Sequence, residues 1–170
     1  FEEANRSFER LFSILSAERR TRTRLAVTFR HNWTLALLHA GQIRRALESS
    51  DAVVEIVREL GGGRISSPYT LSTRASLLSY AGRHDEAIAT LEEALAAATT
   101  ATGSQVPFWT NCIAARVYAE AGRFAEAEAL TREVAGRSGR VLGENHPSAA
   151  MYINSYGALL ASRGKYAEAE

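Results

Sequence analysis

The sequence is poor in residues that cross-link, anchor or interrupt a chain: it has one cysteine, one lysine and three prolines in 170 residues. A single thiol excludes an internal disulfide framework and a cysteine-based zinc site, and it fits a reducing compartment. No apolar run reaches the roughly 18 residues of a membrane-spanning helix, and no charged-then-apolar signal sequence opens the chain. We therefore expect a cytoplasmic protein with no membrane partner.

The net charge of +1 is too small to direct the chain towards nucleic acid or an anionic membrane. A mild basic excess in residues 1–50 centres on four arginines: Arg19, Arg20, Arg22 and Arg24. These arginines form either a solvated helix end and turn or a docking patch for an acidic partner. Direct binding of nucleic acid is not expected.

No group of residues has the spacing of an active site. The histidines lie in separate segments, without the spacing of metal ligands: His31, His39, His84 and His146. Cys112 has no histidine near it in the sequence, which argues against a thiol nucleophile. Two carboxylate pairs are expected on solvated helix faces: Glu92 with Glu93, and Glu126 with Glu128. We expect no enzymatic activity, no metal and no cofactor.

A helix–turn–helix pattern recurs along the whole chain. Its clearest copy runs from Ala121 to Ala127, and the turn glycines lie at positions 41, 82, 122 and 164, with spacings of 41, 40 and 42 residues. A period of this size indicates stacked pairs of antiparallel helices. The pattern predicts an all-α fold with helices over residues 1–18, 22–40, 43–60, 67–81, 84–101, 107–121, 124–139 and 148–163, and a further helix from residue 166.

Residue size is also repeated around each turn. The residue four before each glycine is large: Leu37, Leu78, Tyr118 and Leu160. The residue five after each glycine is alanine: Ala46, Ala87, Ala127 and Ala169. A second small position lies seven before the glycine: Ala75, Ala115 and Gly157. Close packing of helices requires small residues opposite large ones. Residues two after the glycine are expected to fill the next interface: Ile43, Phe124 and Tyr166, with the more polar His84.

This pattern resembles the tetratricopeptide repeat (TPR), with its small residue in the first helix, large residue before the glycine and alanine after the turn. The repeats are longer than usual, and residues 142–147 read Leu-Gly-Glu-Asn-His-Pro. That connector is similar to the one in the kinesin-light-chain-like subclass, which is common in bacterial multidomain regulators. Residues 103–107 keep its spacing without the histidine. The resemblance implies a right-handed superhelical array of about four repeats.

Under this resemblance residues 1–170 form a single array. It comprises the second helix of a truncated repeat at 1–18, repeats at 22–60, 67–101 and 107–139, and a truncated repeat at 148–170. A repeat cannot bury its apolar face alone. We therefore expect that both ends are incompletely covered and that copies of the chain associate through them.

In this family the first helices of successive repeats line a concave face, which suits an extended peptide or a helix. Residues thirteen, ten and six before each glycine are expected there: Thr28, His31, Leu35, Tyr69, Ser72, Ser76, Trp109, Cys112, Arg116, Met151, Asn154 and Ala158. Arg74 stands where the family usually has a leucine, so either its stem lies along the groove or its head group faces a ligand. The alternative for Tyr69 and Trp109 is that they only pack against neighbouring helices.

We expect the chain to be a non-enzymatic scaffold or sensor module that binds a protein or peptide and belongs to a larger bacterial regulatory protein. The alternative is a switch in which a peptide signal controls an attached effector domain, such as a transcriptional regulator, an NTPase or a kinase. A third interpretation is an array that chiefly mediates self-association. None of these interpretations identifies the partner.

Overall fold

The computed structural model describes residues 2–61, 67–102, 108–143 and 146–169. These residues form nine α-helices and no strand: α1 (Glu2–Ala17), α2 (Arg24–His39), α3 (Ile43–Glu59), α4 (Ser67–Tyr80), α5 (His84–Thr102), α6 (Phe108–Glu120), α7 (Phe124–Leu142), α8 (Pro147–Ser162) and α9 (Tyr166–Ala169). The predicted all-α fold of paired helices is confirmed. The largest difference in a helix end is at α7, which continues to Leu142 rather than ending at residue 139. The connector at residues 103–107 lies outside the described part.

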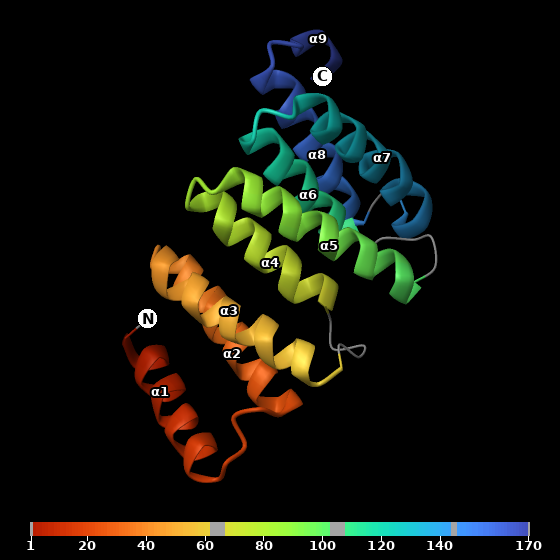
Figure 1. The fold of residues 1–170 in the computed structure, drawn as a ribbon. Helices are drawn as coiled ribbons and strands as arrows, with labels where there is room; N and C mark the ends of the chain where they lie inside the picture. Colours follow the sequence, from red (N-terminus) through yellow and green to blue (C-terminus); the bar gives the residue numbers. More distant parts are fainter. Residues whose placement is uncertain (1, 62–66, 103–107, 144–145, 170) are drawn as a thin grey trace. The chain divides into compact units, whose positions relative to one another are not determined.

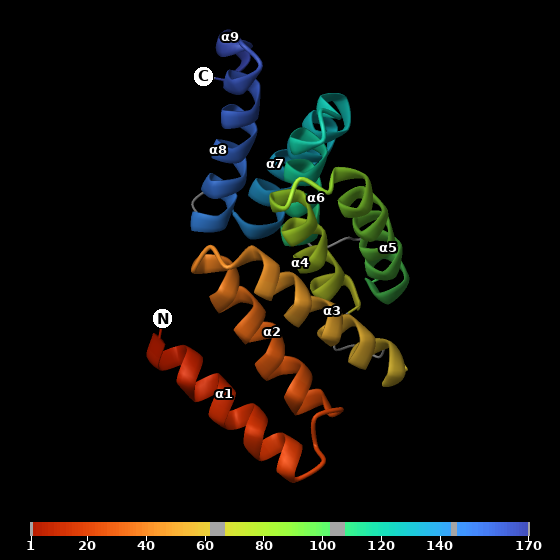
Figure 2. The same ribbon diagram turned by 60° about the vertical axis from the view of Figure 1, so that its left-hand side comes forward.

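The chain divides into two compact units, residues 1–103 and 104–170. In the first unit, α2 packs against α3 and α4 against α5 as antiparallel pairs, while α3 also lies against α4 and α1 against α2 (Figures 1 and 2). One apolar cluster joins α2, α3 and α4 through Trp33, Leu37, Ala46 and Leu77. A second joins α3, α4 and α5 through Val54, Leu71 and Ala94. The core is therefore a series of seams between neighbouring helices, as expected for a repeat array.

The second unit is built in the same way. Here α6 pairs with α7, α7 lies against α8, and the short α9 folds back on α8. His146 begins α8 as its N-cap, because its Nδ1 accepts a hydrogen bond of 3.1 Å from the backbone N–H of Ser148. Among the helices that the structure describes, none is long and apolar enough to cross a membrane.

Each helix pair turns at a glycine whose backbone is left-handed, with φ of +71° at Gly41 and +77° at Gly122. Residues that carry a Cβ rarely adopt this conformation. The residue after the glycine donates its N–H to the carbonyl oxygen of the large residue that precedes the turn: Gln42 to Leu37 at 2.9 Å, Arg83 to Leu78 at 2.9 Å, Arg123 to Tyr118 at 2.8 Å and Lys165 to Leu160 at 3.0 Å. These are Schellman caps. Because the side chains of the same large residues are buried, each of them both closes the turn and fills the seam.

Five of the seven small positions are buried as the sequence predicts, whereas Gly157 and Ala169 are half-buried. Ala46, Ala87 and Ala127 have no exposed surface, and Ala75 has none either. The expectation that the residue two after the glycine fills an interface is wrong for Phe124 and Tyr166, which are 41% and 69% exposed. One face of the Phe124 ring is covered instead by the guanidinium of Arg163, 5.3 Å from the ring centre.

The two ends of the described chain differ in how well their apolar residues are covered. On α1, the Phe8 ring lies 4.9 Å from the Trp33 ring, the Arg30 guanidinium stacks on Phe12, and Leu15 is buried. Phe8 and Phe12 are nevertheless only half-buried and Ile14 is 47% exposed, so this end is incompletely covered, as expected. Phe1 lies outside the described residues, and association through this end stays a prediction. On α8, Met151 and Ile153 are 55% and 52% exposed.

Ala127→Leu tests the packing of the helix pair. We expect this substitution to lower the free energy of unfolding by about 1–3 kcal/mol, because a leucine side chain has no space at a residue without exposed surface. Thermal and urea denaturation would measure the loss. Ala129→Leu is the matched control, since Ala129 is exposed on the same helix. Equal stability of the two variants would contradict the proposed packing.

Candidate binding grooves

A groove in the second unit lies between the first helices α6 and α8, with α7 as its floor. Its volume is about 480 Å³. Four of the residues that the sequence places on the inner face line it: Cys112, Arg116, Met151 and Ala158. The other lining residues are mostly apolar: Ile113, Ala115, Ala119, Thr131, Val134, Tyr152, Ser155 and Leu159. A largely apolar hollow with few polar groups is the usual form of a ligand site.

Among the described residues that line this groove, Arg116 is the only charged one. Its Nη1 donates to Oε1 of Glu120 at 2.9 Å, one turn further along α6. The two side chains are 33% and 32% exposed, and an ion pair with that exposure contributes little to stability. A partner carboxylate would therefore have to share Arg116 with Glu120.

The thiol of Cys112 lies half-buried in the wall of the groove. Burial raises the pKa of this thiol to about 11. The thiol is therefore protonated at neutral pH, which agrees with the expectation that it is not a nucleophile. It remains a chemical reporter for this groove, because the chain has no second cysteine.

Two predicted inner residues of the second unit do not line this groove: Asn154 and Trp109. Asn154 and Ala158 border a second hollow, of about 540 Å³, which α8 forms with Ala169 of α9. The backbone of α9 comes close to α8 at Gly157, where an added Cβ would lie 3.1 Å from the carbonyl oxygen of Ala169. Trp109 is half-buried at the start of α6.

In the first unit, three of the six predicted inner residues are buried, and two of the six are in ring contact. The rings of His31 on α2 and Tyr69 on α4 lie 4.5 Å apart. His31 is buried, its Nε2 has no hydrogen-bond partner among the described residues, and burial lowers its pKa. Ser72 and Ser76 are also buried, and Ser72 donates to the carbonyl oxygen of Pro68 at 2.7 Å. Three side chains keep exposed surface: Thr28, Leu35 and Tyr69.

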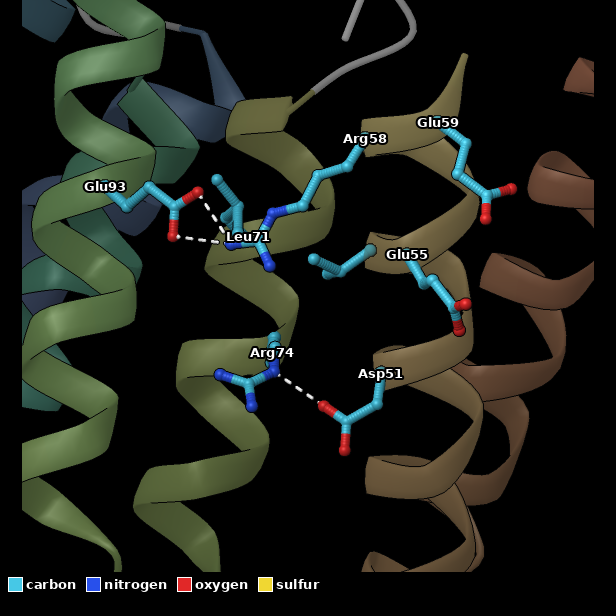
Figure 3. Close-up of a pocket in the computed structure, with 8 residues that line it drawn as sticks. Asp51, Glu55, Arg58, Glu59, Leu71, Arg74 and Glu93 are labelled. Atoms are coloured by element: carbon cyan, nitrogen blue, oxygen red, sulfur yellow. Dashed lines mark hydrogen bonds and ion pairs between the residues drawn. The ribbon is translucent and has the colours of Figure 1, made fainter. Parts of the chain in front are cut away.

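Arg74 lies on a different side of α4 from these residues. It follows Ser72 by two positions, so its side chain leaves the helix about 200° away. Its Nε donates to Oδ1 of Asp51 on α3 at 2.7 Å (Figure 3). Its Nη1 donates to Oγ1 of Thr90 on α5 at 2.8 Å. The head group therefore ties three helices together, which differs from both sequence-based expectations.

Arg74 borders an outer hollow of about 360 Å³ between α3, α4 and α5, which carries four carboxylates: Asp51, Glu55, Glu59 and Glu93. Each of them has an arginine partner. Arg58 holds both oxygens of Glu93 at 3.0 and 3.1 Å (Figure 3), and Arg22 pairs with Glu59 and with Glu55. Three arginines thus partner the four acids within the unit, with Arg22 shared between Glu55 and Glu59. No group of three or more His, Cys, Asp or Glu in the described ranges is arranged to hold a metal ion.

The expectation that Glu128 is solvated is wrong. It is 7% exposed, and it is the only Asp, Glu, Lys or Arg that is buried in the part of the chain that the structure describes. Three cations surround its carboxylate: Lys165 at 3.1 Å from both oxygens, Arg163 at 3.2 Å and Arg132 at 2.5 Å. The hydrogen bond from Lys165 is the main reason that the pKa of Glu128 lies below its ordinary value.

The sequence reasoning missed the floor of the α6–α8 groove, which α7 supplies through Thr131 and Val134. A usable signal exists for Val134. It lies twelve residues after its turn glycine, as do Val53 and Ala94, and all three are buried. A comparison of the second helices position by position would have identified this buried row.

The rate of Cys112 alkylation tests the environment of the groove. At about pH 8 we expect iodoacetamide to react about tenfold more slowly with Cys112 than with the urea-unfolded chain, because a roughly hundredfold lower thiolate fraction is partly offset by higher nucleophilicity. The rate should keep rising with pH towards the raised pKa of about 11. A plateau near the ordinary thiol value of 9.0 would contradict this environment.

Comparison with known proteins agrees with this architecture. Two models of the tetratricopeptide repeat match the chain, one over residues 19–100 and one over residues 114–148. No curated protein matches it. Two crystal structures of nearly identical TPR-like repeats from Podosopora anserina, one of them a point variant, are similar in fold; the protein is described as a kinesin light chain. Their TM-scores are 0.76 and 0.78 at 22% identity, over 99% of this chain and 81% of theirs. The chain belongs to the tetratricopeptide-repeat family.

Proposed function

We propose that the chain is a non-enzymatic module that binds a protein or peptide segment, with the α6–α8 groove as its main contact surface. The observation that carries this proposal is an open, largely apolar hollow between two first helices. TPR domains are in general scaffolds for protein binding. The groove offers what a peptide side chain needs, which is apolar walls, a buried floor and a polar edge.

The distribution of charge in the described residues supports a partner that is recognised chiefly by apolar contact. Arg58, Arg74 and Arg116 all form ion pairs within the chain. The exposed apolar side chain of Met151 lies at the edge of the groove. A segment with an apolar anchor residue would bury this surface without breaking an internal ion pair.

We also propose that the module is part of a larger bacterial regulatory protein in the cytoplasm. The connector that ends in His146 and Pro147 supports the first statement through its similarity to the long-repeat subclass. The lone free thiol of Cys112 fits a reducing compartment. The full-length gene and the attached domains would test this context directly.

Peptides selected from a random phage-displayed library provide the probe for the binding test. Their affinities for the wild-type chain, Ala158→Phe and Ala150→Phe would be measured by fluorescence anisotropy. Ala158 lines the groove and Ala150 does not, yet both are exposed on α8. We expect Ala158→Phe to weaken binding about tenfold or more, because the added ring fills the hollow, and Ala150→Phe to leave it unchanged.

A second variant, Arg116→Ala, examines the polar edge of the same groove. It should reduce the free energy of unfolding by only about 0.3–0.5 kcal/mol through loss of the pair with Glu120. A loss of peptide-binding free energy larger than this would indicate that Arg116 contacts the peptide. If all the groove variants bound the selected peptides as tightly as the wild-type chain, the proposed surface would be wrong.

A further inference from the structure

The second helices carry a residue six positions after the turn glycine that differs in kind between repeats. It is Leu47 in α3 and Ile88 in α5, and both are half-buried. Leu47 packs on the cluster that contains Leu77, a residue of the next first helix. In α7 the same position is Glu128, so a carboxylate replaces an apolar side chain at a buried place.

The partners of Glu128 in the next repeat are also exceptional. They come from the turn between α8 and α9, where Arg163 precedes Gly164 and Lys165 follows it. The residue before the glycine is alanine in the other three turns: Ala40, Ala81 and Ala121. Lys165 is the only lysine in the chain. One acid and two cations therefore occur together. Relative to their turn glycines, Glu128, Arg163 and Lys165 hold the positions that leucine, alanine and glutamine hold at the first turn.

A third cation connects the same carboxylate to the middle of α8. Arg132, one turn after Glu128, donates through Nη2 to Glu128 and through Nε to the hydroxyl of Tyr156 at 2.9 Å. Glu128 thus holds α8 directly at its C-terminal end and through Arg132 near its centre. The residues between these points include Ala158 and Leu159, which line the α6–α8 groove.

We propose that Glu128 is a positioning residue, which holds α8 against α7 by charge and so fixes one wall of the α6–α8 groove. The consequence for ligand binding rests on the proposed function, whereas the effect on α8 does not. Loss of the carboxylate leaves three cations around an empty centre, so α8 and α9 separate from α7 more readily. Loss of the carboxylate together with Arg163 and Lys165 does not have this effect, since a buried ion pair can be replaced by apolar residues at little cost. The remaining cation, Arg132, is 60% exposed and keeps its hydrogen bond to Tyr156.

Hydrogen exchange of the unliganded chain, followed by mass spectrometry, tests this role. Glu128→Gln should make the amides of α8 and α9 exchange about tenfold or more faster, with α6 unchanged. Glu133→Gln is the matched control, because it also breaks an ion pair on α7, with Arg137 at 2.8 Å, but Glu133 is 50% exposed. This control should exchange like the wild-type chain.

A triple variant, Glu128→Leu with Arg163→Ala and Lys165→Gln, copies the residues of the first turn: Leu47, Ala40 and Gln42. It should restore slow exchange in α8. That result is expected if unpaired charge is what loosens α8 in Glu128→Gln, and it is not expected if Glu128 acts only by packing. The selected peptides should bind Glu128→Gln more weakly than they bind Glu133→Gln and the triple variant.

Two results would overturn the proposal: α8 exchanging equally fast in Glu128→Gln and Glu133→Gln, or a triple variant that exchanges as fast as Glu128→Gln. Fast exchange in Glu128→Gln together with peptide affinities that no groove variant alters would instead count against the proposed function and leave the positioning role intact.

Discussion

The rest of the structure depends on the tight glycine turn that joins two antiparallel helices. At each turn a left-handed glycine lets the following N–H reach back to a carbonyl oxygen, as Gln42 does to Leu37. The side chain of that same residue is buried in the seam, and an alanine such as Ala46 gives the second helix room to approach. Because the geometry of each helix pair is determined within its own turn, the array can be extended by stacking pairs. The contacts that stabilise such an array lie between neighbouring helices.

This local character explains what the sequence could predict. Helix ends and seam residues follow from the 41-residue spacing and from residue size, since both are decided within one turn. The environment of Glu128 was not predictable in this way, because its partners Arg163 and Lys165 are 35 and 37 residues further along the chain. The prediction for Arg74 failed for a similar reason. Comparison with the family suggested that Arg74 lies on the inner face. Its head group instead lies where the direction of its side chain on α4 and the presence of Asp51 place it. Contacts between repeats depend on pairs of positions, which periodicity alone does not show.

Charge and apolar surface have separate roles in this molecule. The arginines of the outer hollow, Arg58 and Arg74, connect neighbouring helices through Glu93 and Asp51, and the cations around Glu128 do the same between α7, α8 and the following turn. The surface that we propose for a partner is the α6–α8 groove, whose described lining has a single charged residue. In this account ionic contacts position the helices, and the groove between first helices recognises the ligand. How the eight other inner-face residues, such as Tyr69 and Trp109, contribute to binding stays a prediction.

The most direct test of the central claim is to map backbone amide chemical shifts while a library-selected peptide is titrated into the isotopically labelled chain. The account predicts that the largest shifts fall in α6 and α8, at residues that line the groove, such as Cys112 and Ala158. Shifts concentrated instead in α3 and α5, around the outer hollow that Arg58 and Glu93 border, would contradict it.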